Sequence, residues 1–291
     1  MEQAGQAVCP GTLSNYYRHL PISNQSSPLC FHTAMASPLK RFLAIALPLL
    51  LAACAGGMET HSRRARPGFT APAAVAIPVD PSPYSVHGVD VSKYQGDIDW
   101  QAAAQGGVQF AWIKSTEGAD HLDENFARNW RGAAEAGIPR GAYHFAFWCR
   151  TPAEQMRWFQ QNVPVDEDAL PPVLDVELTP TSKSCTRSLY REEVLREMRE
   201  MLEMMERHYG KRPVIYSTVD FYQGILHSNA LDDYPIWVRS TKYEPKVKYG
   251  NRKWHFWQYQ SDGRVPGINA KVDRNAFYGT RRQWDAFLTG K

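Results

Sequence analysis

Short apolar segments alternate with amphipathic segments from Val86 onward, and this alternation restricts the possible folds more than any other feature of the sequence. Seven segments have the composition of strands. They cover residues 88–92, 109–115, 141–147, 172–177, 213–217, 235–239 and 254–259. A repeated strand and helix pattern predicts a mainly parallel sheet, either open or closed into a barrel. Because the later strands are separated by shorter helices, we expect an irregular barrel.

Helix ends are recognisable between these strands. Thr151 offers a capping hydroxyl, and it is followed by a proline and by Glu154, a combination that predicts a helix start. We expect another helix to run from a cap at Asp123 to a stop at Gly137. The longest predicted helix spans about residues 188–209, where apolar residues recur every three or four positions and form one buried face.

The segment 171–177 carries the most informative chemical signal. Apolar residues enter this strand, and Asp175 and Glu177 end it, separated by one residue. Side chains two positions apart on a strand share a face, which puts the two carboxyl groups about 6–7 Å apart. At this separation one carboxyl has a raised pKa and the other stays ionised, a division that glycosidic cleavage requires. The pair is equally compatible with a divalent cation site or with simple exposure.

Further acids and aromatic residues lie on other strands. Asp90 is near the end of the first strand and Asp273 is near the other end of the chain. An apolar strand end is a costly place for an unpaired charge, so we interpret the acids as one cluster at the carboxyl ends of barrel strands. Phe145 and Trp237 are candidate sugar contacts, because sugars stack on aromatic rings. We expect His144, which alternates out of phase with its neighbours, to be a packed or supporting residue.

Other classes of function find little support. The chain has 33 basic and 30 acidic residues, and this even balance argues against nucleic acid as a partner. The sequence contains no His-Glu-x-x-His motif and no paired cysteine motif of a zinc site. It also lacks a nucleotide-binding loop and the Gly-x-Ser-x-Gly elbow of serine hydrolases.

Residues 39–56 have the layout of an export signal. Two cations precede an apolar run of 12 residues that ends at Ala53, and small residues follow. The run is shorter than the about 20 residues that a membrane-spanning helix needs. Its ending, Leu-Ala-Ala-Cys54, resembles a bacterial lipobox. Lipidation of Cys54 would hold the exported protein at the periplasmic face of a bacterial membrane; an ordinary cleaved signal is the alternative.

The composition divides the chain into four parts. We expect Met35 to be the native start, so that residues 1–34 are an upstream extension and residues 35–53 are the signal peptide. Residues 54–85 are rich in Pro, Ala, Gly and Ser and are expected to form a flexible tether. Residues 86–291 are expected to form one catalytic domain.

The cysteines fit export. Apart from Cys54, the expected mature chain contains Cys149 and Cys185, each of which follows a predicted strand. We expect a disulfide between them in an oxidising compartment. Two free thiols are the alternative, because connectivity does not follow from sequence.

Seven segments, taken together and in order, resemble the glycoside hydrolase family 25 lysozymes, the Chalaropsis-type muramidases. They are GVDVSKYQGDIDW (88–100), FAWIKSTEG (110–118), GAYHF (141–145), LDVE (174–177), IYS (215–217), WQY (257–259) and VDRNAF (272–277). The resemblance covers about residues 86–288. It implies an α/β fold, an irregular (β/α)-barrel of the TIM-barrel type with five β/α units and three additional strands.

The resemblance also implies hydrolysis of the β-1,4 bond between N-acetylmuramic acid and N-acetylglucosamine in peptidoglycan. By matched position, Glu177 is the expected general acid, and Asp175 is expected to orient the N-acetyl group of the substrate so that the configuration is retained. Asp90 and Asp273 are expected to tune this pair. The expected substrate contacts by this match are Tyr143, Tyr216 and Gln258. The resemblance implies no metal and no organic cofactor, and we expect a monomer.

The sequence departs from the family pattern after the sixth strand. Arg239 and Lys242 stand where many relatives have smaller or neutral residues, which leaves the glycan subsite preference open. Two alternatives to a lysozyme remain. One is a barrel that binds peptidoglycan or another glycan without cutting it, and the other is a hydrolase of a different N-acetylated polysaccharide such as chitin.

Overall fold

The computed structural model describes residues 78–178 and 183–289. The expected upstream extension, the signal peptide, the lipidation site Cys54 and most of the expected tether lie outside the described residues. Among the described helices, none is both long and apolar enough to cross a membrane.

Eight strands close into a barrel, in the order β1-β9-β8-β7-β6-β5-β4-β2, and β2 pairs with β1 to complete the ring. The barrel strands are β1 (His87–Val91), β2 (Ala111–Glu117), β4 (Arg140–Phe145), β5 (Val173–Val176), β6 (Val214–Ser217), β7 (Ile236–Arg239), β8 (Phe256–Val265) and β9 (Ile268–Phe277). Neighbouring strands are parallel except at β9, which runs antiparallel to both β8 and β1. A short strand, β3 (His121–Leu122), pairs with β2 outside the ring.

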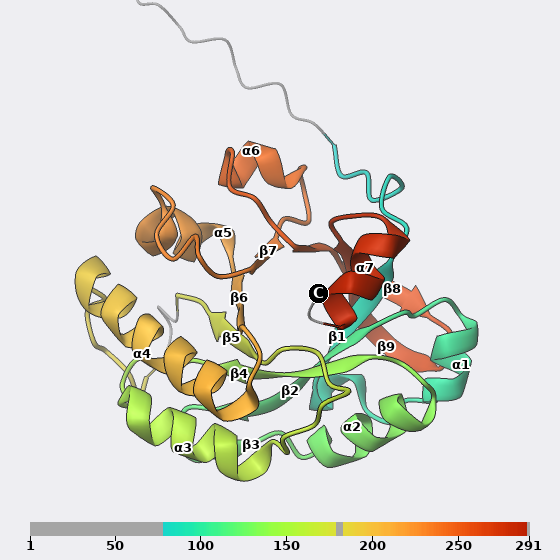
Figure 1. Ribbon diagram of the computed structural model, residues 1–291, viewed down its shortest axis with the longest axis horizontal. Helices are drawn as coiled ribbons and strands as arrows, with labels where there is room; N and C mark the ends of the chain where they lie inside the picture. Colours follow the sequence, from blue (N-terminus) through green and yellow to red (C-terminus); the bar gives the residue numbers. More distant parts are fainter. Residues whose placement is uncertain (1–77, 179–182, 290–291) are drawn as a thin grey trace, which may run out of the picture. The chain divides into compact units, whose positions relative to one another are not determined.

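The first five barrel strands are each followed by a helical segment, and β7, β8 and β9 complete the barrel. The helices are α1 (Trp100–Gln105), α2 (Phe126–Glu135), α3 (Pro152–Asn162), α4 (Arg191–Tyr209), α5 (Val219–Phe221), α6 (Pro245–Tyr249) and α7 (Arg281–Leu288). Two further turns are η1 (Lys93–Gln95) and η2 (Tyr222–Leu226). Figure 1 shows α1 to α4 outside the strands. The expected irregular barrel is therefore confirmed.

The caps of two helices test the predicted helix starts, and one prediction is confirmed while the other is wrong. At the start of α3, Thr151 and Glu154 form the reciprocal capping box. The prediction that Asp123 caps α2 is wrong, because the helix begins at Phe126 and its cap position is Asn125. The Asp123 carboxylate instead accepts hydrogen bonds from the backbone N–H groups of Asn125 and Lys93, at 3.0 and 2.9 Å. It therefore ties η1, which follows β1, to the start of α2.

Large aromatic side chains fill one end of the barrel interior. Trp112 stacks on Trp237 with ring centroids 5.7 Å apart. Gly141 makes room for this stack, because a Cβ atom at that position would clash with the Trp112 ring. The amino-terminal end of the barrel is closed by α7, whose Trp284 lies 5.3 Å from the Phe110 ring. The remaining space inside the ring is at the carboxyl ends of the parallel strands.

The end of the expected tether packs on the barrel. The ring of Tyr84 lies 5.2 Å from that of Trp254 and 6.1 Å from that of Trp257. The backbone N–H of Asp80 donates a hydrogen bond to the Glu244 carboxylate at 2.9 Å. The structured part of the chain therefore begins before the expected boundary at residue 85.

Candidate active site

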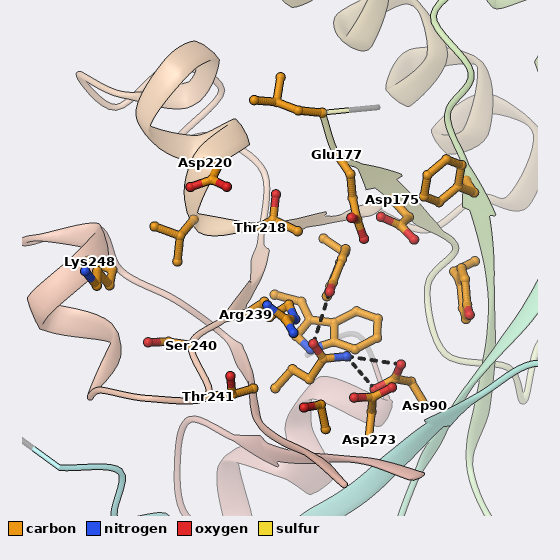
Figure 2. A pocket seen from close by; sticks show the side chains of 18 of the residues that line it. Asp90, Asp175, Glu177, Thr218, Asp220, Arg239, Ser240, Thr241, Lys248 and Asp273 are labelled. Carbon is orange, nitrogen blue, oxygen red and sulfur yellow. Dashed lines mark hydrogen bonds between the residues drawn. The ribbon is translucent and has the colours of Figure 1, made fainter. Parts of the chain in front are cut away.

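A groove of about 1090 Å³ opens at the carboxyl ends of the parallel strands. The four acids singled out in the sequence, Asp90, Asp175, Glu177 and Asp273, all line it (Figure 2). The predicted substrate contacts Tyr143, Phe145, Tyr216, Trp237 and Gln258 also line this groove. Closure of the barrel thus brings together residues from its first, middle and last strands.

Asp175 and Glu177 are held at the end of β5. The backbone oxygen of Asp175 accepts a hydrogen bond from the N–H of Ala146 at 2.9 Å. The backbone oxygen of Glu177 accepts one from the indole N–H of Trp148 at 3.0 Å. Both carboxyl groups point into the same groove (Figure 2), as alternation along a strand predicts.

A disulfide between Cys149 and Cys185 joins the segment after β4 to the segment after β5. The first cysteine directly follows Trp148, whose indole supports Glu177. The guanidinium of Arg187 donates to the backbone oxygen of Trp148 at 2.9 Å. The disulfide and this arginine therefore fix the residue that orients Glu177.

The two carboxyl groups of the pair have unequal surroundings. Asp175 is 6% exposed, and its Oδ1 atom has no hydrogen bond partner among the described residues. Burial, and then the charge of Glu177, raise the pKa of Asp175 well above its usual value. Burial also raises the pKa of Glu177, but the positive charges of Arg239 and Lys114 oppose this shift. Like charges at close range share protons as a unit, so the pair holds a proton well above the usual carboxyl range.

A buried hydrogen bond network forms the floor of the groove around Asp90. Its carboxylate accepts hydrogen bonds from the side-chain amides of Gln258 and Asn275, at 3.0 and 2.7 Å. The Tyr216 hydroxyl donates to the Gln258 oxygen at 3.0 Å, and the Trp237 indole donates to the Asn275 oxygen at 2.8 Å. Each amide therefore has one fixed orientation, in which its NH₂ group faces the acid.

Asp90 lies directly opposite Asp273 in the pairing of β1 with β9. Burial and this facing charge raise the pKa of Asp90 to about 8, although the amides of Asn275 and Gln258 oppose the shift. Burial raises the pKa of Asp273, whereas the charge of Arg239 lowers it. Near neutral pH this second pair therefore retains a proton and places less negative charge beneath Asp175 than two ionised acids would.

The structure adds Lys114 and Asn275 to the candidate site residues, and it shows that Trp237 is buried beneath the groove. The Nζ atom of Lys114 lies 5.2 Å from the centroid of the Phe145 ring and 2.8 Å from the Glu117 carboxylate. Alternation along β2 could have indicated Lys114, but the pairing of Asn275 with Asp90 has no signal in the sequence. Trp237 is 2% exposed, so it packs beneath the groove and orients Asn275 through its indole N–H.

His144 faces away from the groove, among buried side chains. Its ring nitrogens lie 2.8 Å from the Thr116 hydroxyl and 3.1 Å from the Gln155 amide oxygen. Burial lowers the pKa of His144 to about 4, which keeps the ring neutral at physiological pH. His144 therefore occupies a packed, supporting position.

Positive charge collects at one side of the groove. Arg239 at the end of β7, Lys242 in the next loop and Lys248 on α6 all line it (Figure 2 labels Arg239 and Lys248). The Nζ atom of Lys248 lies 5.0 Å from the Tyr243 ring centroid. Among the described residues, none of these three cations takes part in a salt bridge. Within the same residues, no group of three or more His, Cys, Asp or Glu side chains is placed to hold a metal ion.

The sequence matches the glycosyl hydrolases family 25 over residues 89–268. The chain belongs to this family. It is 39% identical over 215 residues to the uncharacterized protein YegX of Escherichia coli O157:H7, covering 72% of this chain and 76% of that protein. It is 36% identical over 215 residues to lysozyme M1 of Streptomyces globisporus, covering 70% of each.

Its fold is similar to that of a solved family 25 glycosyl hydrolase from Bacillus anthracis, with a TM-score of 0.65 and 37% sequence identity. The similarity covers 73% of this chain and 98% of that one. The chain is therefore a glycoside hydrolase, as expected from its sequence. Asp90, Asp175, Glu177 and Gln258 lie within the matched residues of this family 25 enzyme, and Asp273 lies just beyond them.

Proposed function

We propose that this family 25 glycoside hydrolase is a lysozyme that cleaves the β-1,4 bond between N-acetylmuramic acid and N-acetylglucosamine in peptidoglycan. The proposal depends on one observation, the unequal pair of carboxyl groups that Asp175 and Glu177 place in one groove. The likeness to lysozyme M1 supports peptidoglycan as the substrate.

In the proposed reaction Asp175 binds the N-acetyl group of the muramic acid. Asp175 lines the groove, so its carboxylate is placed to accept the amide N–H of the substrate. A hydrogen bond donated to a carboxylate favours its ionised form. Binding of substrate therefore leaves the negative charge on Asp175 and the shared proton on Glu177.

Glu177 then acts as the general acid. Its proton passes to the glycosidic oxygen while the bond from this oxygen to the anomeric carbon breaks and the N-acetyl oxygen bonds to that carbon. Water next attacks the anomeric carbon, the N-acetyl oxygen leaves it, and Glu177 takes the proton of the water. Two inversions at one carbon give net retention.

The cations beside the groove suit the carboxylates of peptidoglycan. Arg239, Lys242 and Lys248 lie on the wall formed by β7 and α6. Muramic acid carries a lactyl group, and the attached peptides end in carboxylates, whereas chitin is neutral. A charge-assisted contact to a carboxylate is stronger than a neutral hydrogen bond, so we propose that this wall favours peptidoglycan over chitin.

We also propose that the enzyme is exported and held at the periplasmic face of a bacterial membrane by a lipid on Cys54, and that it acts as a monomer. The signal layout of residues 39–56 supports the anchor, and the disulfide is of the kind that persists in an oxidising compartment. Mass spectrometry of the mature protein should find a lipidated Cys54 at its amino terminus. A mature chain that starts elsewhere would contradict the anchor.

Product analysis tests the proposed substrate and stereochemistry. Digestion of purified peptidoglycan should release fragments with muramic acid at the reducing end, and proton NMR of the first products should show the β-anomer. Fragments with N-acetylglucosamine at the reducing end, or faster digestion of chitin oligosaccharides, would reject the lysozyme. Binding without any product would favour the non-catalytic barrel.

A further inference from the structure

A second cleft, of about 830 Å³, is lined by residues that do not line the catalytic groove. Its lining includes Trp254 and His255, which precede β8, and Phe277 and Tyr278, at the end of β9. The cleft is lined by residues of α6 and α7 and by Tyr84, which precedes β1; Figure 1 shows these segments near one another. The reaction proposed above uses none of its residues.

Three mutually packed aromatic rings form one wall of this second cleft. The ring of Trp254 lies 5.2 Å from that of Tyr84 and 4.7 Å from that of Tyr278, and the two tyrosine rings are 5.8 Å apart. Tyr278 is 56% exposed, although it belongs to this packed cluster. Exposed aromatic rings in a concave site are suited to the C–H faces of sugars, which stack on them.

The other lining residues give the cleft an excess of positive charge. Lys246 and Lys253 are exposed, and neither takes part in a salt bridge among the described residues. Arg252 is 7% exposed, and its Nε and Nη1 atoms have no hydrogen bond partner in the described part of the chain. The acid that lines the cleft, Glu244, accepts a hydrogen bond from the backbone of Asp80.

We propose that this second cleft binds an anionic glycan strand, and that the strand belongs to the peptidoglycan on which the groove acts. The identity of the strand rests on the proposed function. Its sugar faces stack on Tyr278 and Trp254, and its carboxylates meet Lys246 and Lys253. A membrane surface is a poorer match to the same residues, because a flat bilayer cannot fill a concave cleft. A phospholipid vesicle is therefore the competing ligand in the test.

Helix α6 lines both sites. Lys248 lines the catalytic groove, whereas Pro245 and Lys246 line the second cleft. A polymer held at the second cleft keeps other segments of the same wall near the groove, which raises their effective concentration. The second cleft therefore increases activity on insoluble peptidoglycan and leaves activity on short soluble fragments unchanged.

The test uses the full chain with Glu177→Gln, so that the wall is bound without being cut. Adding Tyr278→Ala should weaken cosedimentation with purified insoluble peptidoglycan about tenfold, the loss of roughly one aromatic stacking contact. The matched control is Tyr190→Ala, which removes a ring that is 65% exposed and lines neither site. The double variant Lys246→Ala with Lys253→Ala, which changes exposed side chains, should also weaken binding and reduce its salt dependence.

A second set of proteins retains Glu177. The same cleft variants should digest short soluble fragments at the rate of the wild type and insoluble wall more slowly. Undiminished wall binding by both cleft variants would overturn the proposal. Variants that lose binding only to vesicles of phosphatidylglycerol and phosphatidylethanolamine would also overturn it. The cleft variants could lose wall binding while the protein that retains Glu177 releases no muramic acid ends. That result would support the second site and reject the proposal that the enzyme is a lysozyme.

Discussion

Removal of the disulfide should cost both stability and activity. The change is Cys149→Ser together with Cys185→Ser, which opens a loop spanning 36 residues. In the chain-entropy relation a cross-link that closes a loop of this length lowers the entropy of the unfolded chain by about 13 cal/mol/K, which stabilises the folded state by about 4 kcal/mol at 25 °C. Because a domain of this kind has roughly 5–15 kcal/mol of stability, the double variant should fold but unfold at a much lower denaturant concentration.

The assay is urea unfolding followed by tryptophan fluorescence, with and without a reductant. The reductant should destabilise the wild type by nearly as much as the double substitution does, and it should leave the double variant unchanged. Since Cys149 adjoins Trp148, which supports the backbone of Glu177, we also expect a lower kcat with little change in KM. A stability loss below about 1 kcal/mol would refute the loop argument.

Three further predictions concern the barrel and its groove. Gly141→Ala would drive a methyl group into the Trp112 ring and should lower the free energy of unfolding by about 1–3 kcal/mol, measured by thermal denaturation. Because the pKa of Asp90 is raised to about 8, the folded state binds more protons than the unfolded state between pH 4 and pH 8. Stability should therefore fall as pH rises through this range, and Asp90→Asn should flatten the fall in urea titrations. Lys242→Ala with Lys248→Ala should raise KM several-fold for fragments that carry carboxylates and should not change it for neutral chitin oligosaccharides.

A contradicting result exists for each of these changes, and two of them have a matched control variant. Gly224→Ala places its methyl group in open space and should not destabilise the protein; equal losses at Gly141 and Gly224 would contradict the packing argument. If the free energy of unfolding of Asp90→Asn changes with pH as steeply as that of the wild type, titration of Asp90 does not cause the fall in stability. Lys271→Ala removes an exposed cation that does not line the groove, and an equal KM effect there would point to general charge attraction.

The sequence predicts features that depend on neighbouring residues. The strand and helix alternation indicated the barrel, and the hydroxyl and glutamate at residues 151–154 indicated the start of α3. The placement of Asp175 and Glu177 on one face follows from strand geometry alone. These features need no knowledge of how distant segments meet.

Features that depend on barrel closure could not be predicted in this way. Asn275 and Asp90 are 185 residues apart, and they meet because β9 returns antiparallel beside β1. Strand β9 itself has no apolar run, because polar and apolar residues and buried and exposed positions are mixed along it. Asp123 resembles a helix cap in the sequence, but the position of η1 makes it a link between two segments instead.

The unequal carboxyl pair is tested most directly by the rate at which new reducing ends appear in purified peptidoglycan. The wild type and Glu124→Gln, which changes an exposed glutamate that does not line the groove, should release muramic acid ends at equal rates. Glu177→Gln should fold like the wild type and lose at least about a hundredfold in rate, the usual contribution of a general acid. Release by Glu177→Gln at the rate of the wild type would contradict the assignment of the proton donor and the account of catalysis built on it.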